Sequence, residues 1–228
     1  MSLQERQDEL VSTHRAIQQA SLPHILVGGW AVSAFQTRFT TDVDMVLPES
    51  LLADYDELLQ NRGYQKEFDN DVSNVYEGRI VRYEKPVGDN AVQFDALVGA
   101  MRCRQTDAEW SYRYLYQHSV VEPLDVAPEL EGRIPEPALL FALKLHSGRL
   151  ADTRDLVVIS LQADFDRIGA HLYRGNQEKL GEQIEGILER LADEGFKDSF
   201  KGVFQQQELP ESALTELRGF LYEQLEQL

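Results

Sequence analysis

The order of apolar and polar positions divides the chain into a mixed first part and a helical second part. Apolar residues recur at helical spacing in some stretches, and short apolar runs of strand length stand between them. Glycine and proline, at Gly28-Gly29 and Pro48, end two of those runs. In chain order, the pattern predicts helices over 3–20, 30–36 and 51–61, and strands over 24–27, 40–47, 64–68, 72–83 (with a break at Gly78) and 92–98.

The rest of the chain carries a different pattern. Residues 100–135 mix strand, turn and helix signals, and a helix is expected over 138–147 after two prolines. Beyond residue 160 only helical stripes remain, at Leu180, Ile184, Ile187, Leu188 and Leu191, and at Leu214, Leu217, Leu221 and Leu228. We therefore expect an α+β protein: a small mixed sheet flanked by helices over 1–135, then a helical subdomain over 136–228.

Composition limits the partners and the compartment. The 228 residues carry a net charge of −17, which disfavours nucleic acid unless basic residues gather locally, and Arg102, Arg104, Arg113 and Arg133 are candidates for such a patch. Cys103 is the single cysteine, so neither an intramolecular disulfide nor a thiolate metal cluster is expected. The N-terminus lacks the apolar core of a signal peptide, and no apolar run has membrane-spanning length, so a cytoplasmic location without membrane association is expected.

Two carboxylates share one face of the predicted strand over 40–47. Asp42 and Asp44 alternate with Val43 and Met45, so the acids point one way and the apolar residues the other. Their side chains would stand about 6–7 Å apart and repel each other, which solvent or a divalent cation must offset. Taken alone, this motif fits an exposed strand edge with two solvated carboxylates better than it fits a metal site.

Glycines upstream and an acid downstream change that balance. Gly28 and Gly29 lie between a strand and a helix, where backbone N–H groups can approach a phosphate closely. Asp95 interrupts an apolar strand, on the face opposite Val92 and Phe94, and a charge there is unfavourable unless paired or metal-bound. The alternatives are a tight turn for the glycines and a half-exposed sheet face for Asp95.

Together these residues resemble the nucleotidyltransferase superfamily, which includes DNA polymerase β, the minimal nucleotidyltransferases and the antibiotic nucleotidyltransferases. The family pattern is a strand, Gly-Gly, about a dozen residues, Asp-x-Asp and a later acid, here Gly28, Gly29, Asp42, Asp44 and Asp95. Gly-Gly-Trp, and Arg38 followed by Thr41-Asp42, also look like aminoglycoside and lincosamide nucleotidyltransferases. The resemblance spans about residues 24–98 and implies nucleotide binding by Gly28, Gly29, Arg38 and Thr41.

A second segment, residues 137–156, resembles AbiEii-type toxin-like nucleotidyltransferases, and it favours that group. It holds Lys144, Gly148, Asp152 and Asp155, which share one face if a single helix continues through them. The resemblance implies that Lys144 and Asp152 take part in nucleotide binding, with Lys144 on the triphosphate. A solvated helix face is the alternative. The family often has Lys or Arg before the first acid, whereas Ala151 stands here. Cys103 is expected to pack in the core and His146 to lie on a helix surface.

The resemblance implies transfer of a nucleoside monophosphate from a nucleoside triphosphate to a hydroxyl acceptor. Asp42, Asp44 and Asp95 would hold two Mg²⁺ ions, with Mn²⁺ as the alternative metal. The acceptor stays open between tRNA, a protein and a small molecule, and a toxin would have an antitoxin partner. The alternative is a catalytically inactive module on the same fold that senses a nucleotide or binds a partner.

Overall fold

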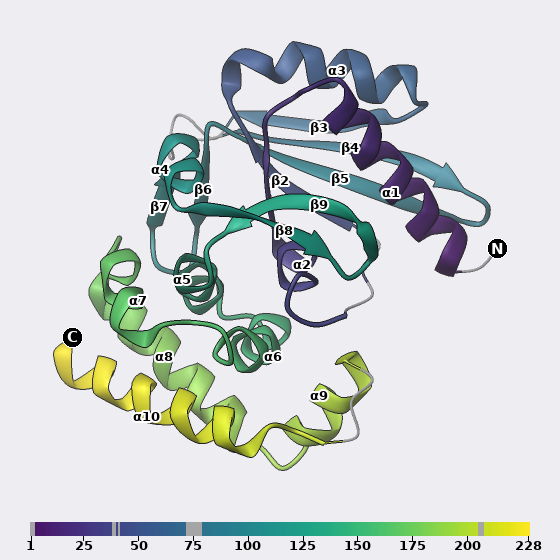
Figure 1. The fold of residues 1–228 in the computed structure, drawn as a ribbon. Coiled ribbons are helices and arrows are strands. Elements are labelled where there is room, and N and C mark those ends of the chain that lie inside the picture. Colours follow the sequence, from purple (N-terminus) through teal and green to yellow (C-terminus); the bar gives the residue numbers. More distant parts are fainter. Residues whose placement is uncertain (1–2, 38–39, 41, 72–78, 205–207) are drawn as a thin grey trace. The chain divides into compact units, whose positions relative to one another are not determined.

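The computed structural model describes residues 3–37, 40, 42–71, 79–204 and 208–228 (Figure 1). The chain divides into two compact units: unit 1 holds residues 1–102 and 110–135, and unit 2 holds residues 103–109 and 136–228. Up to residue 135 the elements are α1 (Leu3–Gln19), β1 (Ile25–Val27), α2 (Gly28–Val32), β2 (Asp42–Leu47), the 3₁₀ helix η1 (Glu49–Leu51), α3 (Leu52–Asn61), β3 (Gln65–Asp71), β4 (Arg79–Val87), β5 (Asn90–Val98), β6 (Ala100–Cys103), β7 (Ala108–Ser111), α4 (Tyr112–Gln117), β8 (Ser119–Leu124) and β9 (Ala127–Pro135).

The main sheet of unit 1 has five strands in the order β1-β2-β5-β4-β3. β2 and β5 run parallel, and the other neighbouring pairs are antiparallel. The expected mixed sheet is therefore confirmed, and most element bounds differ from the expected ones by only a few residues. The strand expected over 72–83 is described only from Arg79, because residues 72–78 lie outside the described part of the chain.

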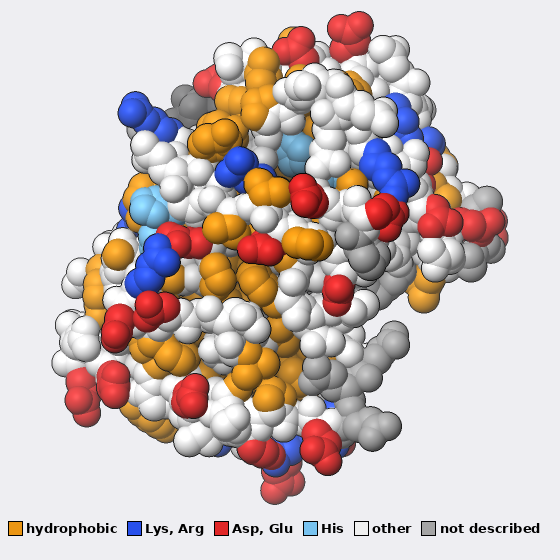
Figure 2. Space-filling view, in the orientation of Figure 1, with side chains coloured by type: hydrophobic (Ala, Val, Ile, Leu, Met, Phe, Trp, Pro, Cys, Tyr) orange, Lys and Arg blue, Asp and Glu red, His pale blue; other side chains and the backbone are white. Residues whose placement is uncertain are grey.

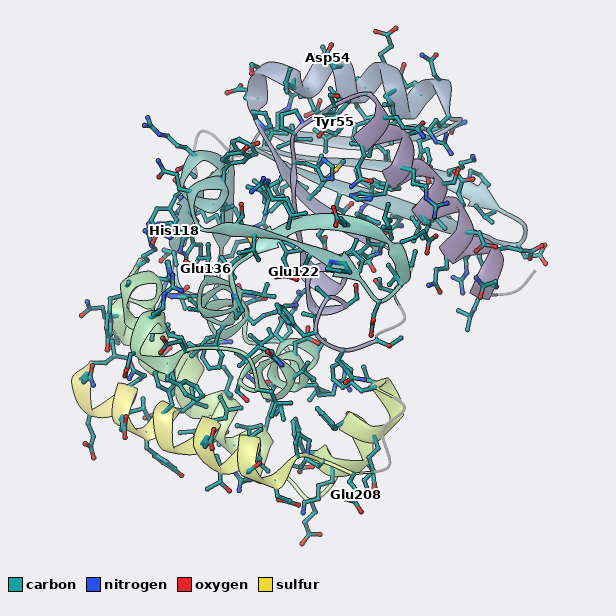
Figure 3. The ribbon with its side chains drawn as sticks, viewed as in Figure 1. Asp54, Tyr55, His118, Glu122, Glu136 and Glu208 are labelled. Carbon is teal, nitrogen blue, oxygen red and sulfur yellow. The ribbon has the colours of Figure 1, made fainter. Side chains whose placement is uncertain are left out.

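One face of this sheet packs against α1 and α3, which lie along it in Figure 1. Tyr64 meets Phe94 edge to face, with ring centroids 5.4 Å apart, and Tyr83 donates a hydrogen bond to Asp56 of α3. Figure 3 shows the alternation on α3, with Asp54 on its outer side and Tyr55 beneath it. Burial of these rings leaves the opposite face of the central strands for polar side chains.

The helix expected over 30–36 is shorter and begins earlier than the pattern indicated. α2 starts at Gly28 and ends at Val32, after which Ser33 donates its hydroxyl to the carbonyl of Trp30 at 2.7 Å. Local side-chain bonds of this kind compete with the helical ladder and end the helix. Residues 100–135, which gave no clear pattern, form four short strands and α4; β8 and β9 pair with each other and β6 pairs with β7.

Beyond residue 135 every element of the described residues is a helix: α5 (Pro137–Ser147), α6 (Leu150–Ile159), α7 (Phe165–Leu172), α8 (Gln177–Ala192), α9 (Phe196–Phe204) and α10 (Glu211–Gln227). The expected stripe of α8 is buried throughout. Of the last expected stripe, Leu214, Leu217 and Leu221 are buried on α10, whereas Leu228 follows the helix and is exposed. None of the helices among the described residues is both long and apolar enough to cross a membrane.

The helix expected over 138–147 is confirmed as α5, and it does not continue through residue 156, because Gly148 adopts a left-handed conformation (φ +51°) that ends it. One expectation for this part was wrong. His146 is fully buried rather than on a helix surface: its Nδ1 lies 2.6 Å from the hydroxyl of Thr106, and its Nε2 lies 2.7 Å from the carbonyl of Leu172. Cys103 is buried, as expected.

Candidate active site

β2 carries the two acids of the Asp-x-Asp motif on one face, as the alternation predicted. Asp42 is exposed and Asp44 half-buried, whereas Val43 and Met45 are completely buried. Thr40 donates its hydroxyl to the Asp42 carboxylate, which fixes the orientation of that side chain at the start of the strand. The two acids therefore face away from the layer of α1 and α3.

Gly28 brings the backbone directly against Asp44. In the sheet, Val27 at the end of β1 is the register partner of Asp44. Gly28 has φ +62°, and a Cβ atom built on it would lie 2.0 Å from Oδ2 of Asp44, which is far inside van der Waals contact. The position therefore excludes any side chain for two reasons, its left-handed backbone and the carboxylate beside it. The glycine motif and the acidic motif form one local site.

Asp95 joins this site through strand pairing. Asp44 and Asp95 are register partners in the parallel β2–β5 pair, so they are neighbours in one row across the sheet. The alternation along β5 places Asp95 on the polar face, with Phe94 and Ala96 buried. A parallel neighbour strand lies about 4.8 Å away, which brings the two carboxylates close together.

The next strand adds a residue that the sequence interpretation did not name. Arg82 of β4 is the register partner of Asp95 and binds both of its oxygens: Nε lies 2.7 Å from Oδ1 and Nη2 lies 2.6 Å from Oδ2. The hydrogen bond to Asp95 raises the pKa of Arg82 above its usual value. Burial acts to lower this pKa, whereas the charges of Asp95, Asp44 and Glu84 raise it. Asp44, Asp95 and Arg82 thus form one row of charges over three strands.

A parallel row lies beside it. Asp42, Gln93 and Glu84 are register neighbours across the same three strands, and Gln93 donates a hydrogen bond to Glu84 at 2.7 Å. The sequence signal for Arg82 and Glu84 is their alternation with buried Val81 and Tyr83 along β4. That signal predicts the sheet face on which Arg82 and Glu84 lie. It does not predict the residues that they bind, because the register of β4 against β5 depends on the tertiary structure.

The donor set suits a hard divalent cation. Three carboxylates on one polar sheet face offer the oxygen ligands that Mg²⁺ and Mn²⁺ prefer, and the absence of a side chain on Gly28 leaves room for the Asp44 carboxylate against the backbone. Of the other predicted nucleotide-binding residues, Gly29 lies in the first turn of α2, whereas Arg38 and Thr41 fall outside the described residues.

The predicted triphosphate contact, Lys144, lies in unit 2 within a cluster of buried charges. Its ammonium donates to Oδ1 of Asp152 at 2.9 Å and to Oδ2 of Asp155 at 2.8 Å, and only 6% of the side chain is exposed. Asp152 also accepts hydrogen bonds from Ser147 and from the backbone and guanidinium of Arg149. We call Lys144, Asp152 and Asp155 the buried charge cluster.

Attraction between opposite charges keeps Lys144 and Asp152 ionised in spite of their burial. Burial acts to lower the pKa of Lys144, but the charges of Asp155 and Asp152 outweigh it and raise the pKa. Burial acts to raise the pKa of Asp152, but Lys144 and Arg149 bring it below the usual value. The cluster therefore joins the end of α5 to the start of α6 across the break at Gly148.

The four arginines proposed as a basic patch are divided between the two units. Within unit 1, Arg113 is exposed on α4, and the guanidinium of Arg133 lies 4.6 Å from the ring centroid of Tyr116. Arg104 belongs to unit 2. The acidic character of the chain is visible in Figure 2, where red side chains line the lower margin of the view along α10, which carries exposed Glu211, Glu216, Glu223 and Glu226.

Comparisons by sequence give no relative: neither a family model nor a curated protein matches the chain. Solved structures do match. The antibiotic-resistance factor ANT(2'')-Ia has a TM-score of 0.51 at 13% identity, over 73% of this chain and 88% of that one. The lincosamide antibiotic adenylyltransferase LnuA, bound to lincomycin, has a TM-score of 0.47 at 15% identity, over 68% of this chain and 97% of that one.

An antigenic nucleotidyltransferase-like protein from Paracoccidioides brasiliensis has a TM-score of 0.48 at 13% identity, over 89% of this chain and 98% of that one. Identities this low support a common fold and nothing finer. Combined with the mixed five-stranded sheet and the helical region after it, the comparison leads to one conclusion. This protein shares the fold of the antibiotic-resistance factor ANT(2'')-Ia.

Proposed function

We propose that this protein is a metal-dependent nucleotidyltransferase that moves a nucleoside monophosphate from a nucleoside triphosphate to a hydroxyl acceptor. One observation carries the proposal: Gly28 places its backbone against Asp44, in the same row as Asp95, on this fold. A solvated strand edge needs neither the glycine contact nor the third acid. The two motifs were joined from sequence spacing alone, and their contact in space supports the joint interpretation.

The chemistry follows from where the side chains lie. Asp42 and Asp44, with Asp95 as the third carboxylate, would hold the divalent cations, which would offset charge on the triphosphate and lower the pKa of the attacking hydroxyl. The acceptor oxygen forms a bond to the α-phosphorus, the bond from that phosphorus to the bridging oxygen breaks, and pyrophosphate leaves. Asp95 would accept the hydroxyl proton. Gly28 and Gly29 would let backbone amides approach the phosphates.

The acceptor is best found by label transfer. The protein would be incubated with Mg²⁺ or Mn²⁺ and each α-³²P-labelled nucleoside triphosphate, in separate arms with total tRNA, with a cell protein extract and with a set of aminoglycosides and lincosamides. We expect label on one acceptor class, and loss of that label in Asp44→Asn. One solved neighbour, ANT(2'')-Ia, is described as an antibiotic-resistance factor and was crystallised with adenylyl-2''-tobramycin, and another is described as a lincosamide antibiotic adenylyltransferase. The small-molecule arm is therefore a necessary one. Label transfer that survives in Asp44→Asn would refute the proposal.

A toxin role depends on which acceptor is modified. If tRNA or a protein takes the label, expression of the active protein should arrest growth of its host, and Asp44→Asn should not. A neutralising antitoxin would then be expected to restore growth when co-expressed. Modification of a small molecule only would exclude this role.

A non-catalytic module on the same fold is the second candidate, and one observation favours it. Both oxygens of Asp95 already bind Arg82, as in a structural ion pair. Such a module would bind a nucleoside triphosphate, with a dissociation constant measurable by calorimetry, and would transfer no label in any arm. Detection of a labelled product excludes it.

A further inference from the structure

The row of Asp44, Asp95 and Arg82 contains one cation among acids that the proposed function assigns to metal ions. The guanidinium of Arg82 contacts Asp95 in the two-pronged geometry that is the strongest arginine–carboxylate arrangement. The side chain of Asp95 is 15% exposed and that of Arg82 is 36% exposed, so the pair is only partly screened by water.

Arg82 resolves the electrostatic problem of the motif before any metal arrives. Asp42, Asp44 and Asp95 stand on one sheet face, and like charges on neighbouring strands destabilise the fold. One guanidinium among these acids lowers the repulsion, and the charges of both Asp95 and Asp44 act on Arg82. A divalent cation in the same place would do the same, and it would compete with Arg82 for the oxygens of Asp95 and be repelled by its charge.

Resting on the proposed function, we propose that Arg82 is a positioning residue that holds Asp95 while the metal site is empty and sets the metal concentration at which the site fills. Loading of a cation at Asp42 and Asp44 draws Asp95 away from Arg82, or leaves Asp95 shared between them. The ion pair thus links cation occupancy to release of the third carboxylate. Arg82 does not touch the reacting atoms; it acts through Asp95.

The chain offers a matched control on the same strand. Arg79 of β4 also binds both oxygens of an aspartate, Asp69 on β3, and its side chain is 36% exposed, as that of Arg82 is. The spacing of three residues puts Arg79 on the opposite sheet face, away from Asp44 and Asp95. Arg79→Gln removes the same charge and the same kind of ion pair without touching the metal site.

The test measures Mn²⁺ binding without nucleotide, by electron paramagnetic resonance of free Mn²⁺, in the full-length wild type, Arg82→Gln, Arg82→Lys and Arg79→Gln. Removing one charge from a site of this exposure is worth about 1–1.5 kcal/mol, so we expect Arg82→Gln to bind Mn²⁺ roughly tenfold more tightly. Arg82→Lys, which keeps the charge without the fork, should fall between Arg82→Gln and wild type. Arg79→Gln should match wild type.

A merely structural role for Arg82 would lower the melting temperature of Arg82→Gln and leave Mn²⁺ affinity unchanged, and that result would overturn the inference. Weaker Mn²⁺ binding in Arg82→Gln would overturn it as well. The same titration separates this failure from failure of the proposed function, because Asp44→Asn must lose Mn²⁺ binding whatever Arg82 does. Mn²⁺ binding that is unaffected by Asp44→Asn would refute the metal site itself.

Discussion

A charge cluster on the sheet of unit 1 and a charge cluster in unit 2 have similar compositions, but they differ in exposure and in partners. The first is the row of Asp44, Asp95 and Arg82 on a polar sheet face, beside exposed Asp42. The second is the buried charge cluster of unit 2, in which Lys144 neutralises Asp152 and Asp155 with almost no exposure. Both contain aspartates and a basic residue in hydrogen-bonded ion pairs.

The two clusters differ in how far their negative charge is neutralised by the protein, and this difference indicates separate roles. In the sheet cluster three acids stand beside a single guanidinium, and this excess of negative charge favours binding of a cation. In the buried charge cluster the ammonium of Lys144 donates to both acids. Arg149 and Ser147 donate further hydrogen bonds to Oδ2 of Asp152. Breaking a buried pair leaves an uncompensated charge in the interior. We infer that the first cluster serves chemistry and the second holds α5 and α6 together.

The largest expected effect is on activity at the sheet cluster. Asp44→Asn keeps the shape of the side chain and removes the metal-binding charge. Loss of about 4 kcal/mol of metal-dependent stabilisation of the transition state corresponds to a fall in the rate of nucleotidyl transfer of roughly 10³-fold. The free energy of unfolding should change by less than about 0.5 kcal/mol or rise, because one repelling charge is gone. Rate assays and urea unfolding of the same preparation measure both, and a strongly destabilised Asp44→Asn would remove the contrast between the clusters.

Lys144→Met should show the reverse behaviour. It leaves Asp152 and Asp155 buried without their common cation, which is expected to lower the free energy of unfolding by about 3–5 kcal/mol. Lys144→Met combined with Asp152→Asn and Asp155→Asn, which removes all three charges, should recover part of that loss. Urea unfolding followed by circular dichroism measures it. A direct triphosphate contact by Lys144 remains a prediction; it would show as lost activity with unchanged stability in Lys144→Met.

A smaller effect is expected at Gly28, where a methyl group would meet the Asp44 carboxylate. Gly28→Ala should reduce transfer by about 10²-fold, because a displacement of the carboxylate on the order of 1 Å is enough for such a loss. Gly99→Ala is the matched control: Gly99 also has a positive φ, of +79°, but nothing lies within 4 Å of its Cβ position.

Both variants share the backbone strain of an alanine at positive φ, about 1–2 kcal/mol. Only Gly28→Ala should lose activity in the rate assay. Equal losses in both would mean that strain, rather than contact with Asp44, determines the need for glycine at position 28.

The smallest effect concerns proton binding and applies to both units. Burial lowers the pKa of His14 to about 3 and that of His146 to about 4, and it also lowers the pKa of His24. The unfolded chain binds protons at these residues below about pH 6.5 while the folded chain does not, so stability falls as the pH falls below that value.

Between pH 7.5 and 5, His14 and His146 should each remove about 2 kcal/mol from the free energy of unfolding. His14→Asn should flatten this dependence in urea unfolding measured across that range, even if it lowers stability at pH 7.5. An unchanged slope would contradict the buried neutral state. Asp152, whose pKa is lowered, contributes stability above the unfolded value near 3.9 and loses it at lower pH.

The comparison also marks the limit of prediction from sequence. Alternation along β2 and β5 gave the face of Asp42, Asp44 and Asp95 correctly, because side chains alternate in any strand. The helical stripe of α8 was equally direct. By contrast, residues 100–135 gave no clear pattern, because their strands form two-stranded pairs, which bury less of each strand than the five-stranded sheet does.

The sequence alone predicts which residues can take part in chemistry, namely the glycine pair and the three acids, and on which face of a strand each acid lies. The partners of these residues depend on the tertiary structure. Register between β4 and β5 brings Arg82 onto Asp95, and the left-handed Gly148 turns α6 so that Lys144 lies buried between two aspartates. Local pattern reports the direction of a side chain, whereas a charge's partner depends on which distant segment packs beside it.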